Sequence, residues 1–149
     1  MAHIILPDGV PGISGPMTAY PETGERMKSL AEALLRGPSS LSQAEREMIA
    51  AFVSSRNECV FCTSSHAAVA RYLMGSECKV VDDVLENYQD AAVSEKLKVL
   101  LAIAGKVRED GRLALVLRAD ASLIARLQTL PRVLLQRVDP VPKLSTLTS

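Results

Sequence analysis

Apolar side chains recur at steps of three and four positions through most of residues 25–110, and no segment before residue 111 alternates apolar and polar positions as a half-buried strand would. Such spacing gathers the apolar side chains on one face of a helix. The pattern predicts a first helix over residues 25–35, a second from about 42 to the break near 57, a third over 59–74 and a short one over 81–88. A longer helix follows, with apolar residues over 97–104 and its end before residue 111.

The second predicted helix has the clearest start signal in the chain. Ser42 and Glu45 have the S-x-x-E spacing in which each side chain accepts a hydrogen bond from the backbone N–H of the other residue. Within this helix Glu47 lies opposite the apolar face, among small residues. We therefore expect another helix to approach closely at this carboxylate.

The two ends of the chain differ from its middle. Residues 1–24 hold four of the 8 prolines and four of the 8 glycines, which predicts an extended arm of turns. Residues 1–110 carry 11 basic and 15 acidic side chains, whereas residues 111–149 carry 6 and 2. We expect a helical core over 1–112, then an atypical segment over 113–149 with one helix at about 113–130 and a partly disordered tail from 131.

The composition narrows the class of protein. A chain of 149 residues with 48% hydrophobic and 23% charged side chains fits one soluble globular domain. A net charge of +0, no Trp, 2 Phe and 3 Tyr argue against nucleic acid and anionic lipid as partners. The sequence shows no targeting segment and no long uncharged apolar run, so we expect a cytoplasmic protein that does not enter membranes. Three cysteines in a reducing compartment indicate reactive or metal-binding thiols.

Two of the cysteines lie at the predicted start of the third helix. Cys59 and Cys62 form a C-x-x-C run, which can close a small disulfide and reopen it by exchange. A helix N-terminus favours a thiolate there, and His66, one turn after Cys62, can exchange a proton with it. These residues share a helix face with Val69 and Leu73, which we expect to be buried.

The C-x-x-C spacing alone leaves three interpretations open. The thiols form a redox pair, or half of a zinc site completed by His66 and Cys78, or an inert pair of buried cysteines. Zinc is disfavoured because the chain must turn before Cys78 and no second C-x-x-C follows. Taken singly, Glu47 fits a solvated helix residue and His66 a hydrogen-bonded core histidine.

Taken together, these residues form a more specific constellation, because eleven residues separate Glu47 from the run Cys59-x-x-Cys62-x-x-x-His66. With the segments LRGPSSLS (35–42), EREMIA (45–50) and NECVFCTSSH (57–66), the sequence resembles the carboxymuconolactone decarboxylase-like superfamily. Within it, the resemblance is to AhpD-like alkyl hydroperoxidases and their peroxidase-related branch, over about residues 1–112.

This resemblance implies an all-α, AhpD-like fold with the C-x-x-C at the start of a buried helix, and homo-oligomers that are trimers or higher multiples. It implies a thiol-dependent peroxidase that reduces alkyl hydroperoxides, needs no haem, metal or other cofactor, and is reset by an external dithiol or protein reductant. By the same resemblance Cys62 is the peroxidatic thiol, Cys59 the resolving thiol, and Glu47 with His66 the proton relay that deprotonates Cys62.

Two features depart from the family pattern. AhpD has a histidine between its two cysteines where this sequence has Phe61. The family-like pattern also ends near Gly111, and a shifted reading frame or an unrelated replacement would explain the change. Three other functions remain open: a non-enzymatic zinc- or redox-sensing helical module, a carboxymuconolactone decarboxylase- or lactonase-type enzyme, and an inactive helical scaffold.

Overall fold

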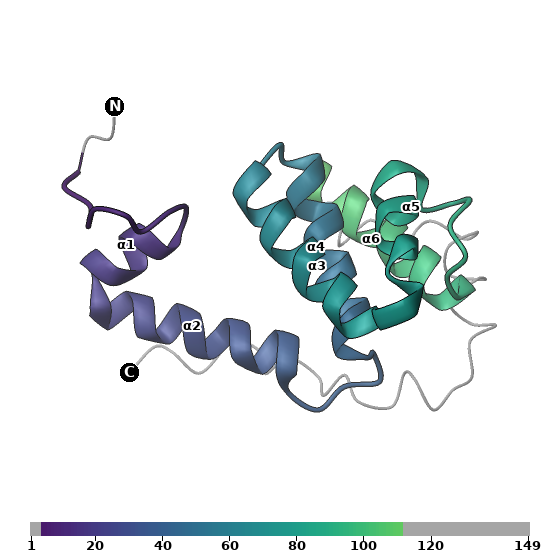
Figure 1. The fold of residues 1–149 in the computed structure, drawn as a ribbon, viewed down its shortest axis with the longest axis horizontal. Helices are drawn as coiled ribbons and strands as arrows, with labels where there is room; N and C mark the ends of the chain where they lie inside the picture. Colours follow the sequence, from purple (N-terminus) through teal and green to yellow (C-terminus); the bar gives the residue numbers. More distant parts are fainter. Residues whose placement is uncertain (1–3, 112–149) are drawn as a thin grey trace, which may run out of the picture.

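A computed structural model describes residues 4–111, and Figure 1 shows that every regular element within them is a helix. The elements are α1 (Ser14–Ala19), α2 (Pro21–Arg36), α3 (Gln43–Arg56), α4 (Val60–Met74), the 3₁₀ turn η1 (Gly75–Glu77), α5 (Lys79–Asn87) and α6 (Glu95–Glu109). The all-α fold is therefore confirmed. The helix expected over 113–130, the tail from 131 and the boundary at 112 lie outside the described residues.

The N-terminal arm is not the irregular segment that its prolines suggested. It contains α1, and α2 begins at Pro21, four residues before the start expected at 25. Proline has no N–H to offer and a fixed φ, so it fits the first turn of a helix, where the N–H groups have no helical partner. Gly24 lets α2 pass close to α1, because a Cβ there would collide with the carbonyl of Met17.

The helix ends follow the local chemistry of the sequence. At the start of α3, Ser42 Oγ accepts a hydrogen bond from the N–H of Glu45 at 3.1 Å, and the Glu45 carboxylate accepts one from the N–H of Ser42 at 2.7 Å. This confirms the predicted capping box. Gly75, with a φ of 58°, ends α4 where the sequence placed the stop. Ser94 caps α6 by accepting a hydrogen bond from the N–H of Leu97.

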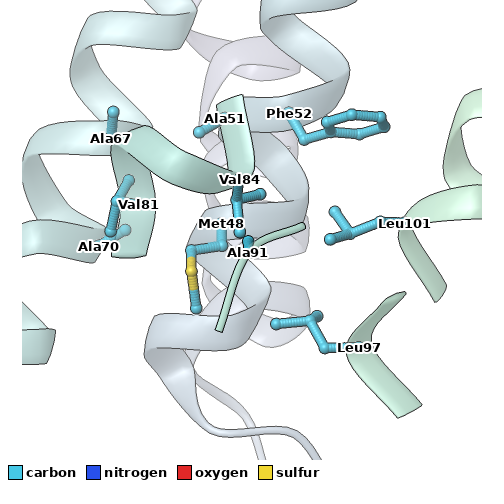
Figure 2. Packing of buried hydrophobic residues seen from close by; sticks show 10 residues of the cluster. All are labelled: Met48, Ala51, Phe52, Ala67, Ala70, Val81, Val84, Ala91, Leu97 and Leu101. Carbon is cyan, nitrogen blue, oxygen red and sulfur yellow. The ribbon is translucent and has the colours of Figure 1, made fainter. Parts of the chain in front are cut away.

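The core lies where α3 to α6 meet (Figure 2). α3 and α4 supply small side chains at their contact, so the two helices pack closely along their length. α5 and α6 cover the rest of α3 with branched aliphatic side chains. The buried cluster comprises Met48, Ala51 and Phe52 from α3, Ala67 and Ala70 from α4, Val81 and Val84 from α5, Ala91 from the next loop, and Leu97 and Leu101 from α6.

The buried face of α4 is not the one that the sequence pattern favoured. Ala67 and Ala70 are 2% and 0% exposed, whereas Leu73, expected to be buried, is 40% exposed. Steps of three and four positions fit the alanine stripe as well as its neighbour, and the smaller side chains allow the closer helix contact. α4 thus buries one face only, and the C-x-x-C and its histidine lie half-buried beside that face.

The apolar stripe of α2 is exposed in this chain. Met27, Leu30 and Leu34 are 45%, 60% and 63% exposed, and Figure 1 shows α2 extending away from the bundle of α3 to α6. The predicted stripe therefore exists but has no cover within residues 4–111. None of the described helices is both long and apolar enough to cross a bilayer.

Candidate functional site

Glu47 and His66 meet between α3 and α4. The Glu47 side chain is 1% exposed, and its Oε2 lies 2.6 Å from Nδ1 of His66. The small residues around Glu47 predicted that a second helix approaches there. That helix is α4, which packs along α3. The structure thus joins two of the four candidate residues by a short hydrogen bond, although 19 positions separate them in the chain.

The other oxygen of Glu47 has a cationic partner. Oε1 lies 2.5 Å from Nη2 of Arg36, the last residue of α2. A carboxylate removed from water is stable as an anion only when charges or hydrogen-bond donors replace the lost hydration. Arg36 and His66 supply these contacts, one to each oxygen.

Arg36 was not among the candidate residues from the sequence, although it lies in the LRGPSSLS segment. A buried carboxylate predicts a cationic partner, but spacing cannot say which of several arginines supplies it. The structure shows what places Arg36: the guanidinium of Arg46 donates to the carbonyls of Leu34 at 3.0 Å and Gly37 at 2.8 Å. These bonds tie the end of α2 to α3 and hold the neighbouring Arg36 at Glu47.

Cys59 and Cys62 lie close together where α4 begins. Cys59 is the N-cap residue, and its Sγ accepts a hydrogen bond from the N–H of Cys62 at 3.4 Å. Both are free thiols and half-buried. This geometry resembles an N-cap serine with sulfur in place of oxygen. The two sulfurs are therefore held on the same side of the helix start.

The two thiols differ in acidity. The pKa of Cys59 is lowered because the side chain and the backbone N–H of Cys62 both donate hydrogen bonds to its sulfur. The pKa of Cys62 is raised because its thiol is the donor in that pair, because it is partly desolvated, and because a charged Cys59 disfavours a second anion. Cys59 is therefore the more acidic thiol of the reduced pair.

His66 lies one helical turn beyond Cys62 on α4, and its side chain is 31% exposed. Residues four apart on a helix are surface neighbours. Nδ1 of the ring is bonded to Glu47, so Nε2 lies on the side of the ring away from that carboxylate. A chain of polar contacts therefore joins Arg36, Glu47 and His66, and His66 is a helix-surface neighbour of Cys62 by its spacing.

The N-terminal arm reaches the same helix start. Gly12, with a φ of 60°, lies so close to the ring of Phe61 that a Cβ would collide with it. Phe61 stands between the two cysteines and is 37% exposed. Sequence reasoning noted Phe61 only as a departure from AhpD. The structure shows that the ring of Phe61 is also the surface on which the N-terminal arm packs at Gly12.

Cys78 does not join this group. It follows η1, half-buried, and within residues 4–111 no cluster of three or more His, Cys, Asp and Glu side chains is arranged to hold a metal ion. A groove of about 490 Å³ lies elsewhere, between α3, η1 and the start of α6, and is lined by Met48, Met74, Val80 and Leu97 among others. The cysteines, Glu47 and His66 do not border it.

The fold and this polar cluster define an all-α protein with a C-x-x-C one helical turn from a histidine that is bonded to a buried carboxylate. The model of the carboxymuconolactone decarboxylase family matches residues 21–106, which is more than half of the chain. The chain belongs to this family. A search of curated proteins finds no match to it.

Two solved structures share the fold. One is the "alkylhydroperoxidase AhpD core: uncharacterized peroxidase-related protein" from Ralstonia eutropha JMP134, with a TM-score of 0.65 at 23% identity; the match covers 78% of this chain and 58% of that one. The other is an uncharacterized peroxidase-related protein from Silicibacter sp. TM1040, with a TM-score of 0.61 at 26% identity, covering 85% and 81%. The resemblance to AhpD-like, peroxidase-related proteins is therefore confirmed.

Proposed function

We propose that the chain is a thiol-dependent peroxidase that reduces alkyl hydroperoxides through a Cys59–Cys62 disulfide cycle. The observation that carries this proposal is the buried Glu47 carboxylate, bonded to His66 one helical turn from a C-x-x-C. A short dithiol and an adjacent acid–base pair are the parts that such a cycle requires. Membership of the family and the peroxidase-related names of the structural relatives support it.

The chemistry balances with these residues alone. His66 takes the proton of Cys62, and the thiolate attacks one peroxide oxygen; the O–O bond breaks, the sulfur becomes a sulfenic acid, and the alkoxide leaves as an alcohol with that proton. Cys59 then attacks the oxidised sulfur. The S–O bond breaks, and the hydroxide leaves as water with a proton from solvent, which balances the proton that Cys59 lost when it became a thiolate. An external dithiol is oxidised when it reduces the resulting disulfide.

The pKa directions fit distinct roles for the two thiols. Cys62, whose pKa is raised, needs a base to become a nucleophile, and His66 with Glu47 is the base one turn away. Cys59, whose pKa is lowered, supplies a thiolate for the second step without one. Alternatively Cys59, as the more acidic thiol, attacks the peroxide itself. The experiment below separates these two assignments.

The proposal also includes partners and a location. The reductant is an external dithiol or a protein that carries one, which the reducing cytoplasm supplies. A homo-oligomer, as a trimer or a multiple of it, would cover the exposed stripe of Met27, Leu30 and Leu34 on α2. A second copy of the chain is the expected cover, because the resemblance implies self-association.

The test is a count of free thiols before and after one equivalent of cumene hydroperoxide. Wild type should fall from three thiols to one, with Cys78 remaining, and the lost pair should return on addition of dithiothreitol. Cys59→Ser should still consume the peroxide and leave a sulfenic acid on Cys62, which dimedone traps. Cys62→Ser should consume none, and Cys78→Ser is the matched control that should behave as wild type.

Two results would decide against the proposal. Peroxide consumption by Cys62→Ser equal to that of wild type would overturn the assignment of Cys62. Oxidation that stops after one equivalent, despite excess reductant and peroxide, would favour the competing interpretation of the chain as a non-enzymatic redox-sensing module.

A further inference from the structure

We propose that Arg36 is a positioning residue of this site: its guanidinium keeps the buried Glu47 carboxylate anionic and leaves Nε2 of His66 free to accept a proton. The inference rests on the proposed thiol chemistry of the site, and it adds a residue from α2 to a relay otherwise made by α3 and α4. Arg36 acts through Glu47 and does not touch the thiols in the proposed steps.

The geometry divides the two oxygens of Glu47 between two partners. Oε1 lies 2.5 Å from Nη2 of Arg36, and Oε2 lies 2.6 Å from Nδ1 of His66. The carboxylate is 1% exposed, whereas the side chains of Arg36 and His66 are 30% and 31% exposed. Water therefore solvates the two outer groups, while the anion between them depends on its partners.

Charge balance decides where a proton lies in this cluster. With Arg36 present, the buried carboxylate is already neutralised by a group that does not lose its proton near neutral pH. His66 can then donate from Nδ1 to Glu47 and keep Nε2 unprotonated. Without Arg36, the carboxylate and imidazole together would bind one more proton, because a buried anion with no fixed cation favours it. That extra proton would block the acceptor that Cys62 needs.

Arg36 has a larger effect on the protonation of Glu47 and His66 than the other charged groups near them. Arg46 is engaged with two backbone carbonyls at the end of α2 and has no ion pair with Glu47 among the contacts of the described residues. From α4, the titratable group that contacts the carboxylate is His66, and Cys62 lies one helical turn before it.

The fold places Arg36 for this role. It ends α2, where the helix C-terminus favours a cation, and its position beside Glu47 is fixed by the Arg46 bonds that tie the end of α2 to α3. A side chain held by its own backbone anchor loses less freedom on pairing than an arginine on a free surface. The same contacts that connect α2 to α3 therefore position the Arg36–Glu47 ion pair.

The test measures the pH dependence of Cys62 alkylation by iodoacetamide in a Cys59→Ser/Cys78→Ser background, where Cys62 is the only thiol. Arg36→Gln should move the acid limb of the rate to higher pH by about 1 to 2 units and keep the same plateau at high pH. Arg36→Lys should restore most of the shift, because the charge is retained. Arg26→Gln, at an exposed arginine of α2 outside the site, is the matched control and should leave the profile unchanged.

An unchanged midpoint in Arg36→Gln, or a lower plateau without a shift, would overturn the proposal, since a merely structural role predicts only the latter. A second measurement covers the case in which Arg36→Gln does not fold. The ring ¹⁵N spectrum of His66 in the unsubstituted chain, assigned with His3→Gln, should show that the neutral ring carries its hydrogen on Nδ1; a neutral ring with its hydrogen on Nε2 would contradict the proposal.

These readouts do not depend on peroxide. If Cys62 shows the predicted pH shift but the protein consumes no hydroperoxide, the proposed function fails while the role of Arg36 stands. If peroxide is consumed at equal rates by wild type and Arg36→Gln across the pH range, the role of Arg36 fails while the proposed function stands.

Discussion

Single residues explain how a short motif becomes a site. The sequence predicted a carboxylate at position 47, facing another helix, and thiols near an imidazole. The structure joins Glu47 to His66 and adds Arg36, which no spacing rule could select. A pattern along one helix predicts which side chains share a face, but an ion pair between helices depends on loop geometry. Here that geometry is fixed by Arg46 and backbone carbonyls.

The acidity difference within the cysteine pair gives a pH prediction. Because the pKa of Cys59 is lowered and that of Cys62 is raised, alkylation should appear at Cys59 first as pH rises and at Cys62 only at higher pH. Peptide-resolved mass spectrometry after brief iodoacetamide pulses measures both. Cys62→Ala should move the Cys59 profile to higher pH, since the side-chain donor is gone. Labelling of both cysteines over the same pH range would contradict the hydrogen-bonded pair.

At the scale of helices, the sequence predicted the elements whose signals are local. The sequence predicted α3 to α6 with nearly their observed spans, because their apolar periodicity and caps are local signals. It failed for α1 and for the buried face of α4. Prolines that begin helices look like turn residues in isolation, and two adjacent stripes of α4 have the same period, so that only the packing of Ala67 and Ala70 on α3 decides between them.

The close contact of α3 and α4 predicts that added volume there is costly. Ala70→Leu should lower the free energy of unfolding by about 1 to 3 kcal/mol, because Ala70 is 0% exposed and a larger side chain has no space. Ala68→Leu, at an exposed position on the same helix, is the matched control and should change it by less than about 0.5 kcal/mol. Denaturant unfolding compares the two variants, and equal stabilities would show that the two helices do not pack as described.

The contact of the arm with α4 predicts an effect on thiol access. Gly12→Ala should displace the arm, because its Cβ would collide with Phe61 and its φ of 60° disfavours a side chain. Faster cysteine alkylation and faster hydrogen exchange over residues 10–16 are expected. Gly9→Ala carries the same backbone strain at a φ of 73° but meets no atom within 4 Å, so it separates strain from collision. Equal alkylation rates in both variants would indicate that the arm does not shield the site.

At the scale of the whole molecule, the apolar stripe on α2 is not covered by any other part of residues 4–111. The sequence predicted the stripe itself, but not that α2 would extend from the bundle, because the direction of a helix depends on contacts distant in sequence. The family relationship was predictable from the motif constellation. The chain nevertheless covers only 58% of the Ralstonia relative, so the fold similarity concerns a part of that protein.

Self-association through α2 can be tested by charge. Leu30→Glu should shift the protein to smaller species in sedimentation velocity, because Leu30 lies in the middle of the exposed stripe and a carboxylate there would be desolvated in an interface. Ser29→Glu, also exposed on α2 but outside the stripe, should leave the size distribution as in wild type. A monomeric wild type, or identical distributions for all three proteins, would rule out this surface.

The most direct test of the central claim is the single-turnover rate of cumene hydroperoxide consumption by wild type and Glu47→Gln at pH 7. We expect the variant to be slower by about 10²-fold or more, since the amide cannot stabilise a proton on His66, while its thiol count and helical content stay unchanged. Equal rates would show that the buried carboxylate takes no part in activating the thiol.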